Sequence, residues 1–484
     1  MRTIKYFGIL LAAMLMNISA FSQKSGHNIH IIIDDYPDTL LFLVNYYGTT
    51  NQIKDTAFSK KGDFVFKGDK ALPGGIYLAV TGDRKYFEML VDKEQHFSIH
   101  TKSGDFVNSA KIKGSKDNEE FYTYLKYLEK KDKERKAIEA EYKNKLEDKE
   151  AKKQMQEKLD KLNDEVKAYK NQIIKNKPET FLAAILRASK EPEIPTELPL
   201  NKDGKPDSTY IYRYYKSHFF DGFNFSDERL LRSPIYAQKI KKYFTKVLLQ
   251  HPDTLIKEAD SIIALAKPNK ETYKFCIWYF TYASETSEIM GLDAVFVHLV
   301  KKYYETGEAY WVNETVLKNI TKRANTLDRL LIGKTAPNMI MIDTTADINH
   351  LVSLWGVKSP YTVVLFWDPD CGHCRHEIPL IRDWMNENAD KYGVKVFAVC
   401  SDTSLVKWKN FLKEFKIKQW INVNGTRSAT ENYHDLYDII STPTIYLLDE
   451  NKKILAKRLG SKQLEEFIER DYKRKHKQKE DKDK

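Results

Sequence analysis

The stretch Tyr361-Thr-Val-Val-Leu-Phe-Trp-Asp-Pro-Asp-Cys-Gly-His-Cys374 decides the fold of the C-terminal part of the chain. Its first seven residues form a near-continuous apolar run, which is typical of a buried central strand. A short loop ends at Asp370, and a helix is predicted to begin at Cys371. The two-residue spacer places Cys374 one helical turn further on, close enough for a disulfide. A strand, a Cys-x-x-Cys pair and a helix in this order indicate a redox-active dithiol.

The position of the first cysteine explains its predicted chemistry. Unpaired N–H groups and the dipole at a helix N-terminus favour an anion, so Cys371 is expected to be the nucleophilic thiolate. Cys374 would then resolve the mixed disulfide. A zinc site is the main alternative, with His373 and His376 as further ligands. No second cysteine pair is present to complete a tetrahedral site, so no metal is predicted. A purely structural disulfide is the other alternative.

Strands and helices alternate on both sides of this motif. Strands are expected over 394–400, 444–448 and 454–458, with helices over 405–415 and 463–472. The alternation predicts an α/β domain over residues 333–472. The tail, residues 473–484, is almost entirely charged and is predicted to be disordered.

Several segments of this domain resemble a known family. Phe366–Cys374 resembles the active-site segment of thioredoxin-fold proteins, and Ser441-Thr-Pro-Thr444 is similar to their cis-proline loop, where Pro443 would face the disulfide. Residues 333–337 and 340–343 look like the extra N-terminal strand of exported thiol–disulfide oxidoreductases of the TlpA and ResA type. The resemblance implies a thioredoxin-like oxidoreductase whose redox centre is the Cys371–Cys374 disulfide, with no bound cofactor.

The resemblance also suggests roles for individual residues. Leu365 stands where cytosolic thioredoxin has a buried acid, and Glu377, three residues after the second cysteine, is the candidate replacement for moving protons. The implied catalytic residues are Cys371, Cys374, Glu377 and Pro443. Five neighbours are expected to contact the substrate or tune the dithiol: Trp367, Asp370, Gly372, His373 and Thr442. His373 would favour the thiolate, whereas the charge of Asp370 would oppose it.

The start of the sequence predicts export. Arg2 and Lys5 precede an apolar run over 6–16, and small polar residues follow, which is typical of a signal peptide over residues 1–22. The run is too short to span a bilayer. No cysteine lies near the predicted cleavage point, so a lipoprotein is not expected. The predicted location is the periplasm or cell envelope.

Three regions lie between the signal peptide and the α/β domain. Residues 27–114 contain short β-rich runs separated by turns and predict a small antiparallel β-sandwich-like domain. Residues 115–177 lack Gly and Pro and predict a long helical arm, whose apolar seam over 155–173 would close a helical hairpin or a homodimer. Residues 178–332 look mostly helical. This layout resembles bacterial proteins that join domains of unknown function to a thioredoxin module.

Composition limits the possible functions. The chain has 484 residues, a net charge of +11 and four cysteines. This surplus is modest for the length, so no nucleic-acid partner is predicted. The expected function is a periplasmic thiol–disulfide oxidoreductase, first of all a protein-disulfide reductase. Disulfide-bearing exported proteins would be its substrates, and a membrane thiol protein its electron donor. A disulfide oxidant or isomerase, and an envelope binding or scaffold protein that docks through its thioredoxin module, are the alternatives.

Overall fold

The chain forms two compact units, residues 1–247 and residues 248–484. The computed structural model describes residues 26–36, 39–59, 61–145, 147–345, 347 and 350–480. The predicted signal peptide lies outside these described residues. Within the described ranges, every helix is too short or too polar to span a membrane.

Eight strands open the first unit and form two four-stranded sheets, ordered β4-β1-β7-β8 and β3-β2-β5-β6. The strands are β1 (His27–Asp34), β2 (Leu40–Tyr47), β3 (Thr50–Phe58), β4 (Asp63–Gly68), β5 (Gly75–Thr81), β6 (Tyr86–Val91), β7 (His96–Lys102) and β8 (Lys111–Lys113). The predicted β domain is confirmed, although β1 and β7 pair in parallel. β3 and β8 had escaped prediction because they carry few apolar residues.

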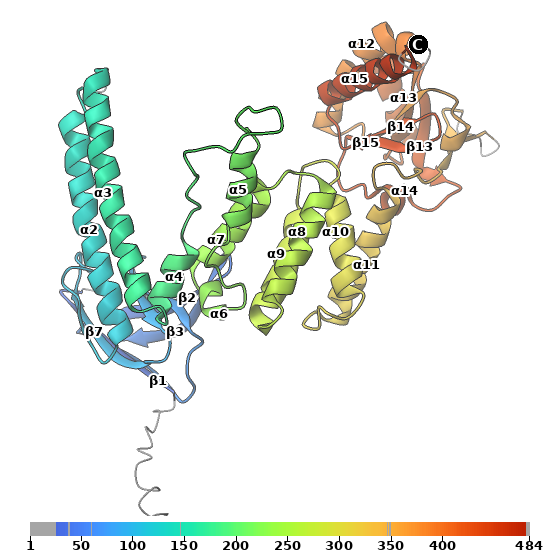
Figure 1. Ribbon diagram of the computed structural model, residues 1–484. Helices are drawn as coiled ribbons and strands as arrows, with labels where there is room; N and C mark the ends of the chain where they lie inside the picture. Colours follow the sequence, from blue (N-terminus) through green and yellow to red (C-terminus); the bar gives the residue numbers. More distant parts are fainter. Residues whose placement is uncertain are drawn as a thin grey trace, which may run out of the picture. The chain divides into compact units, whose positions relative to one another are not determined.

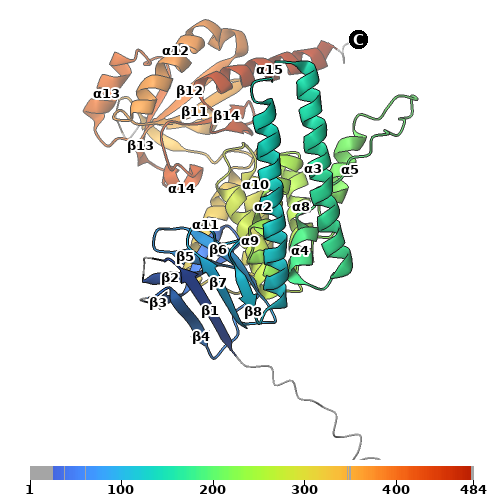
Figure 2. The same cartoon turned by 90° about the vertical axis from the view of Figure 1, so that its left-hand side faces the viewer.

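The predicted helical arm is a hairpin of α2 (Lys116–Tyr142) and α3 (Lys149–Asn176), which lie side by side (Figure 2). The ring of Tyr169 in α3 contacts the rings of Tyr124 and Tyr127 in α2. At Tyr169, the predicted seam therefore packs within the chain. The buried amide of Asn118 fixes α2 to β6, because it bonds to both the N–H and the C=O of Leu90 at 2.8 Å.

Mostly helical segments complete the first unit and open the second. The first unit ends with α4 (Phe181–Ala188), α5 (Tyr210–His218), α6 (Glu228–Leu231), α7 (Pro234–Lys242) and the π-helical turn η1 (Tyr243–Val247). The second unit begins with α8 (Pro252–Ala266), α9 (Lys270–Glu285), α10 (Asp293–Leu299), the π-helical turn η2 (Val300–Tyr304) and α11 (Glu314–Arg329). The helices α8–α11 thus belong to the same compact unit as the α/β domain, whereas a domain boundary was expected after residue 332.

The α/β domain contains a seven-stranded sheet in the order β10-β9-β13-β12-β11-β14-β15. Its strands and helices are β9 (Ile340–Asp343), β10 (Leu351–Ser353), the 3₁₀ turn η3 (Leu354–Gly356), β11 (Tyr361–Trp367), α12 (Gly372–Tyr392), β12 (Val394–Cys400), α13 (Leu405–Glu414), β13 (Ile421–Ser428), α14 (Tyr433–Tyr437), β14 (Thr444–Asp449), β15 (Ile454–Lys457) and α15 (Ser461–Glu480). Figure 1 shows α12 and α15 beside each other, and the two helices are in contact.

The central strand β11 is buried along its whole length, as the apolar run predicts. It pairs in parallel with β12 and antiparallel with β14. Val363, Leu365 and Trp367 join a core with α12, α13 and α15, while Val364 and Phe366 join a second core on the other face. The predicted disorder after residue 473 is wrong as far as residue 480, because α15 continues to Glu480.

Candidate active site

Cys371 is the N-cap residue of α12. Its Sγ accepts a hydrogen bond from the Cys374 N–H at 3.3 Å and donates one to the Thr442 carbonyl at 3.1 Å. Burial alone would raise the pKa of Cys371. Hydrogen bonds with the Thr442 side chain and with the backbone N–H groups of His373 and Cys374 outweigh burial, so the pKa lies below its usual value. The sulfur therefore lies where a helix N-terminus stabilises a thiolate.

Cys374 has the opposite environment. Its side chain is fully buried in the core formed by β11, α12 and α13. Burial raises its pKa to about 12. All four cysteines are free thiols, and the motif therefore presents its reduced form. A partly exposed thiol with a lowered pKa beside a buried thiol with a raised pKa suits the division into attacking and resolving cysteines.

The loop before β14 faces Cys371. The Thr442–Pro443 peptide bond is cis, and Thr442 supplies the carbonyl that accepts from Cys371. Pro443 and Thr444 help to line a groove of about 490 Å³. The groove is lined by His373, Glu377, Asp438, Ile440, Ser441, Pro443, Thr444, Ile445, Arg458, Leu459 and Gly460. Ile440 is 73% exposed, which leaves an apolar side chain at the rim for a partner to cover.

Glu377 contributes its carboxylate to the same groove. Its Oε2 accepts a hydrogen bond from the Ser461 N–H at 2.9 Å, at the start of α15, and Oε1 lies 3.2 Å from His376 Nδ1. Burial acts to raise the pKa of Glu377, but the Ser461 hydrogen bonds and His376 lower it further than burial raises it. The carboxylate is thus ionised at neutral pH.

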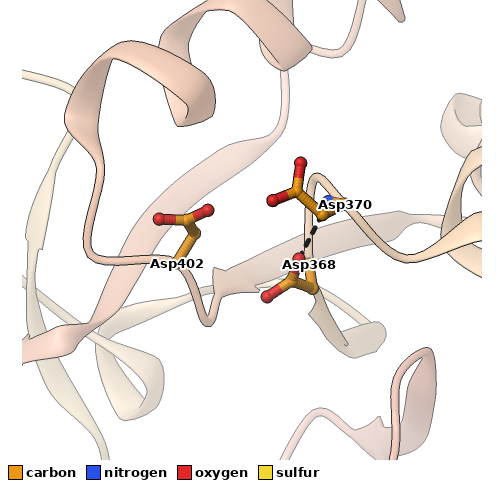
Figure 3. A group of neighbouring side chains, drawn as sticks. All are labelled: Asp368, Asp370 and Asp402. Carbon is orange, nitrogen blue, oxygen red and sulfur yellow. Dashed lines mark hydrogen bonds between the residues drawn. The ribbon is translucent and has the colours of Figure 1, made fainter.

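The carboxylates of Asp368, Asp370 and Asp402 cluster, as Figure 3 shows, and Asp370 directly precedes Cys371 in the chain. The Asp370 N–H donates to Asp368 Oδ1 at 2.8 Å, which shapes the loop before Cys371. The ammonium of Lys407 in α13 lies 2.5 Å from Asp370 Oδ2 and 3.8 Å from Asp402 Oδ2. The negative charge that was expected to oppose the thiolate therefore has a cation beside it.

Of the two roles expected for Trp367, substrate contact does not fit its position, and tuning of the dithiol stays a prediction. Trp367 is fully buried at the end of β11, and its ring packs on Phe411 at 4.4 Å. It belongs to the core that holds Cys374, so a substrate at the surface cannot touch it. Gly372 and His373 are exposed in the first turn of α12, where a partner can reach them.

The structure adds site residues that the sequence motif did not indicate: Lys407, Asp438, Ile440 and Arg458. They come from three segments far along the chain from Cys371: α13, the loop after α14 and the end of β15. Their types carry no signal of their own, since charged and aliphatic residues occur on every surface. Only the sheet topology brings them together.

Comparisons with known proteins agree with this geometry. Residues 331–473 match the Redoxin family model. Upstream, residues 27–121 match a domain of unknown function (DUF4369), and residues 145–326 match another domain of unknown function (DUF5106). The dithiol at a helix N-terminus, the cis-proline loop and the Redoxin match define a redox protein of the thioredoxin fold.

Solved structures from Cytophaga hutchinsonii and Bacteroides vulgatus resemble the C-terminal domain. A domain of a possible thiol–disulfide isomerase from Cytophaga hutchinsonii is 38% identical, over 31% of this chain and 97% of that one, with a TM-score of 0.28. The thioredoxin domain of a thiol–disulfide oxidoreductase from Bacteroides vulgatus is 31% identical, over 29% of this chain and 96% of that one, with a TM-score of 0.26. The curated proteins include no significant match. By its C-terminal domain, the chain belongs to the family of thioredoxin-like thiol–disulfide oxidoreductases.

Proposed function

We propose that the protein is an exported protein-disulfide reductase of the cell envelope that works through the Cys371–Cys374 dithiol. The observation that carries the proposal is the contrast between the two thiols. Cys371 has a lowered pKa at the N-terminus of α12, whereas burial raises the pKa of Cys374 to about 12. The Cys371 thiol can attack at neutral pH. The buried Cys374 thiol is protected until a mixed disulfide forms at Cys371, which it then attacks.

The reaction consumes one substrate disulfide and the two electrons of the dithiol. The Cys371 thiolate attacks one substrate sulfur, and the other substrate sulfur leaves as a thiolate that takes up a proton. Cys374 then loses its proton and attacks Cys371 Sγ, which forms the Cys371–Cys374 disulfide and releases the second substrate thiol. Glu377 is the base proposed to help remove the Cys374 proton. Pro443 and Thr442 present backbone groups to an extended substrate segment.

The cycle closes only if a donor reduces the disulfide again. A membrane thiol protein is the proposed donor, and the dithiol itself needs no further cofactor. Disulfide-bearing exported proteins are the proposed substrates, in keeping with a periplasmic or envelope location. A homodimer through residues 155–173 stays a prediction. Sedimentation that finds a monomer at micromolar concentration would exclude it.

The direction of electron flow is open to a direct test. A reduction potential of roughly −270 mV, as in thioredoxin, supports a reductase, whereas roughly −180 to −120 mV supports an isomerase or an oxidant. The scaffold alternative makes a different prediction, because partner binding would survive when both Cys371 and Cys374 are replaced by Ser.

Turnover of a protein disulfide tests the reductase activity itself. With dithiothreitol as electron donor, Cys371→Ser is expected to abolish reduction of insulin while the fold survives. The matched control is Cys276→Ala, which removes a buried thiol from α9, outside the motif. Full activity of Cys371→Ser would refute the proposal.

A further inference from the structure

The helices before the α/β domain are joined to it by charged contacts on β15 and α14. The buried Lys457 of β15 forms an ion pair with Asp293 of α10, and its Nζ also donates to the carbonyl of Leu330 at 2.6 Å. Lys322 of α11 lies 3.0 Å from Asp435 of α14. The helices α8–α11, most of which lie within the match to a domain of unknown function, are thus attached to the redox domain.

One further contact between these helices and the redox domain lies next to the groove beside Cys371. Asp438 and Arg458 both line the groove, and Arg458 Nη2 lies 2.8 Å from Asp438 Oδ2. Both residues have left-handed backbones, with φ of +49° and +56°. This conformation is strained for residues other than glycine, and surrounding contacts must hold it in place. The position of the groove wall therefore depends on the contacts that hold this ion pair on the side away from the groove.

Arg323 of α11 is placed to do so. Its Nη1 lies 2.5 Å from Glu285 Oε1 of α9, and its Nε lies 3.8 Å from Asp438 Oδ1. Within the part of the chain that the structure describes, this buried Nε has no hydrogen-bond partner. The Asp438 side chain is only 11% exposed, so its carboxylate depends on the two guanidinium groups for compensation.

We propose that Arg323 is a positioning residue for substrate, which holds Asp438 and, through it, Arg458 and the loop that leads to Pro443. Four residues separate Asp438 from Pro443, so a shift of Asp438 moves the groove rim that carries Ile440. The helices upstream of the redox domain thereby set how well an extended polypeptide fits beside Cys371. This inference rests on the proposed function, and it assigns part of that function to α11.

The first test compares Arg323→Ala with Lys322→Ala. The control removes a neighbouring cation that contacts the same short helix α14 through Asp435, a residue outside the groove. Arg323→Ala is expected to raise the KM for a protein disulfide about threefold and to leave kcat unchanged, because Arg323 acts on the groove only through Asp438, across a long contact of 3.8 Å. Lys322→Ala is expected to change neither. Equal KM values for the two variants would overturn the proposal.

A small aromatic disulfide separates positioning from general damage, because it reaches Cys371 without filling the groove. Its reaction with Arg323→Ala is expected to match the wild type. An equal slowing with both disulfides would contradict the proposal. Should Arg323→Ala fail to fold, Asp438→Asn provides the second variant. Asn tolerates the left-handed backbone, so the same KM effect is expected without any change in α11.

Binding without turnover keeps this inference separate from the reductase proposal. The probe is reduced and carboxyamidomethylated α-lactalbumin, an unfolded polypeptide with no disulfide. Its Kd is expected to rise about threefold in Arg323→Ala and not in Lys322→Ala. Inactivity of the wild-type protein on insulin would refute only the reductase. Unchanged binding in Arg323→Ala would refute the role of Arg323 even in an active reductase.

Discussion

Replacing Lys407 with Met should slow the reaction of Cys371 at neutral pH. Lys407 lies 2.5 Å from the carboxylate of Asp370, the residue directly before Cys371, and 3.8 Å from that of Asp402. Without this cation, Asp370 belongs to a cluster of three carboxylates, whose oxygens lie within 4.8 Å of one another, directly before Cys371 in the chain. Their uncompensated charge disfavours the thiolate and raises the pKa of Cys371.

The size of the effect is limited by solvent, because the Lys407 side chain is 53% and the Asp370 side chain 67% exposed. Exposed ion pairs change an equilibrium by roughly 1.5- to fivefold, so the thiolate fraction at a pH well below the pKa of Cys371 should fall about threefold. A more basic thiolate is intrinsically more reactive, with a Brønsted coefficient of about 0.4–0.5. The observed rate of alkylation should therefore fall only about twofold.

Iodoacetamide alkylation of Cys371, followed by mass spectrometry between pH 5 and pH 10, measures this rate. Alkylation of Cys371 should be slower in the variant than in the wild type at low pH. It should be slightly faster in the variant once Cys371 is fully ionised in both proteins. The control is Lys409→Met, which removes an exposed charge from the same helix. An equal slowing at every pH would show an effect on access to the thiol and refute the electrostatic reasoning. An equal effect of Lys409→Met would also refute the electrostatic reasoning.

Three further predictions concern stability and selectivity. Lys457→Met leaves the carboxylate of Asp293 without its buried partner, which should cost about 3 kcal/mol and lower the Tm of the second unit by about 6–12 °C, measured by circular dichroism; a fall below about 2 °C would contradict it. At pH 7 iodoacetamide should modify Cys371 alone, because burial raises the pKa of two other cysteines to about 12; peptide mapping that finds a second adduct in the folded protein would count against this. Glu377→Gln should lower the urea midpoint at pH 7 but not at pH 3. The pKa of this carboxylate is lower in the folded than in the unfolded state, so its charge stabilises the fold above the unfolded pKa of about 4.3, and this stabilisation is lost as the pH falls. An equal loss of stability at both pH values would refute the prediction.

The sequence predicted what depends on local patterns. The apolar run over 361–367 and the Cys-x-x-Cys pair that follows it led to the central strand, the helix and the dithiol, all of which the structure contains. The resemblance also located the cis peptide bond at Pro443. These features are readable because each lies within a few residues of the chain.

Features that depend on long-range contacts were not predictable. Trp367 continues an apolar strand toward the motif, and nothing in its neighbours reveals that its side chain turns into the core. Lys407 meets Asp370 only because α13 follows β12, the strand next to β11. The ion pair of Lys457 with Asp293, which ties α10 to the redox domain, likewise joins residues far apart in the chain.

Trapping of the mixed disulfide is the most direct test of the central claim that Cys371 attacks and Cys374 resolves. A Cys374→Ala variant incubated with an oxidised protein substrate should accumulate a covalent complex through Cys371, because the resolving thiol of the motif is gone. Cys371→Ala should trap nothing, as Cys374 is fully buried. Mass spectrometry of the complex identifies the linked cysteine. A complex through Cys276 or Cys400, or none with Cys374→Ala, would contradict the account.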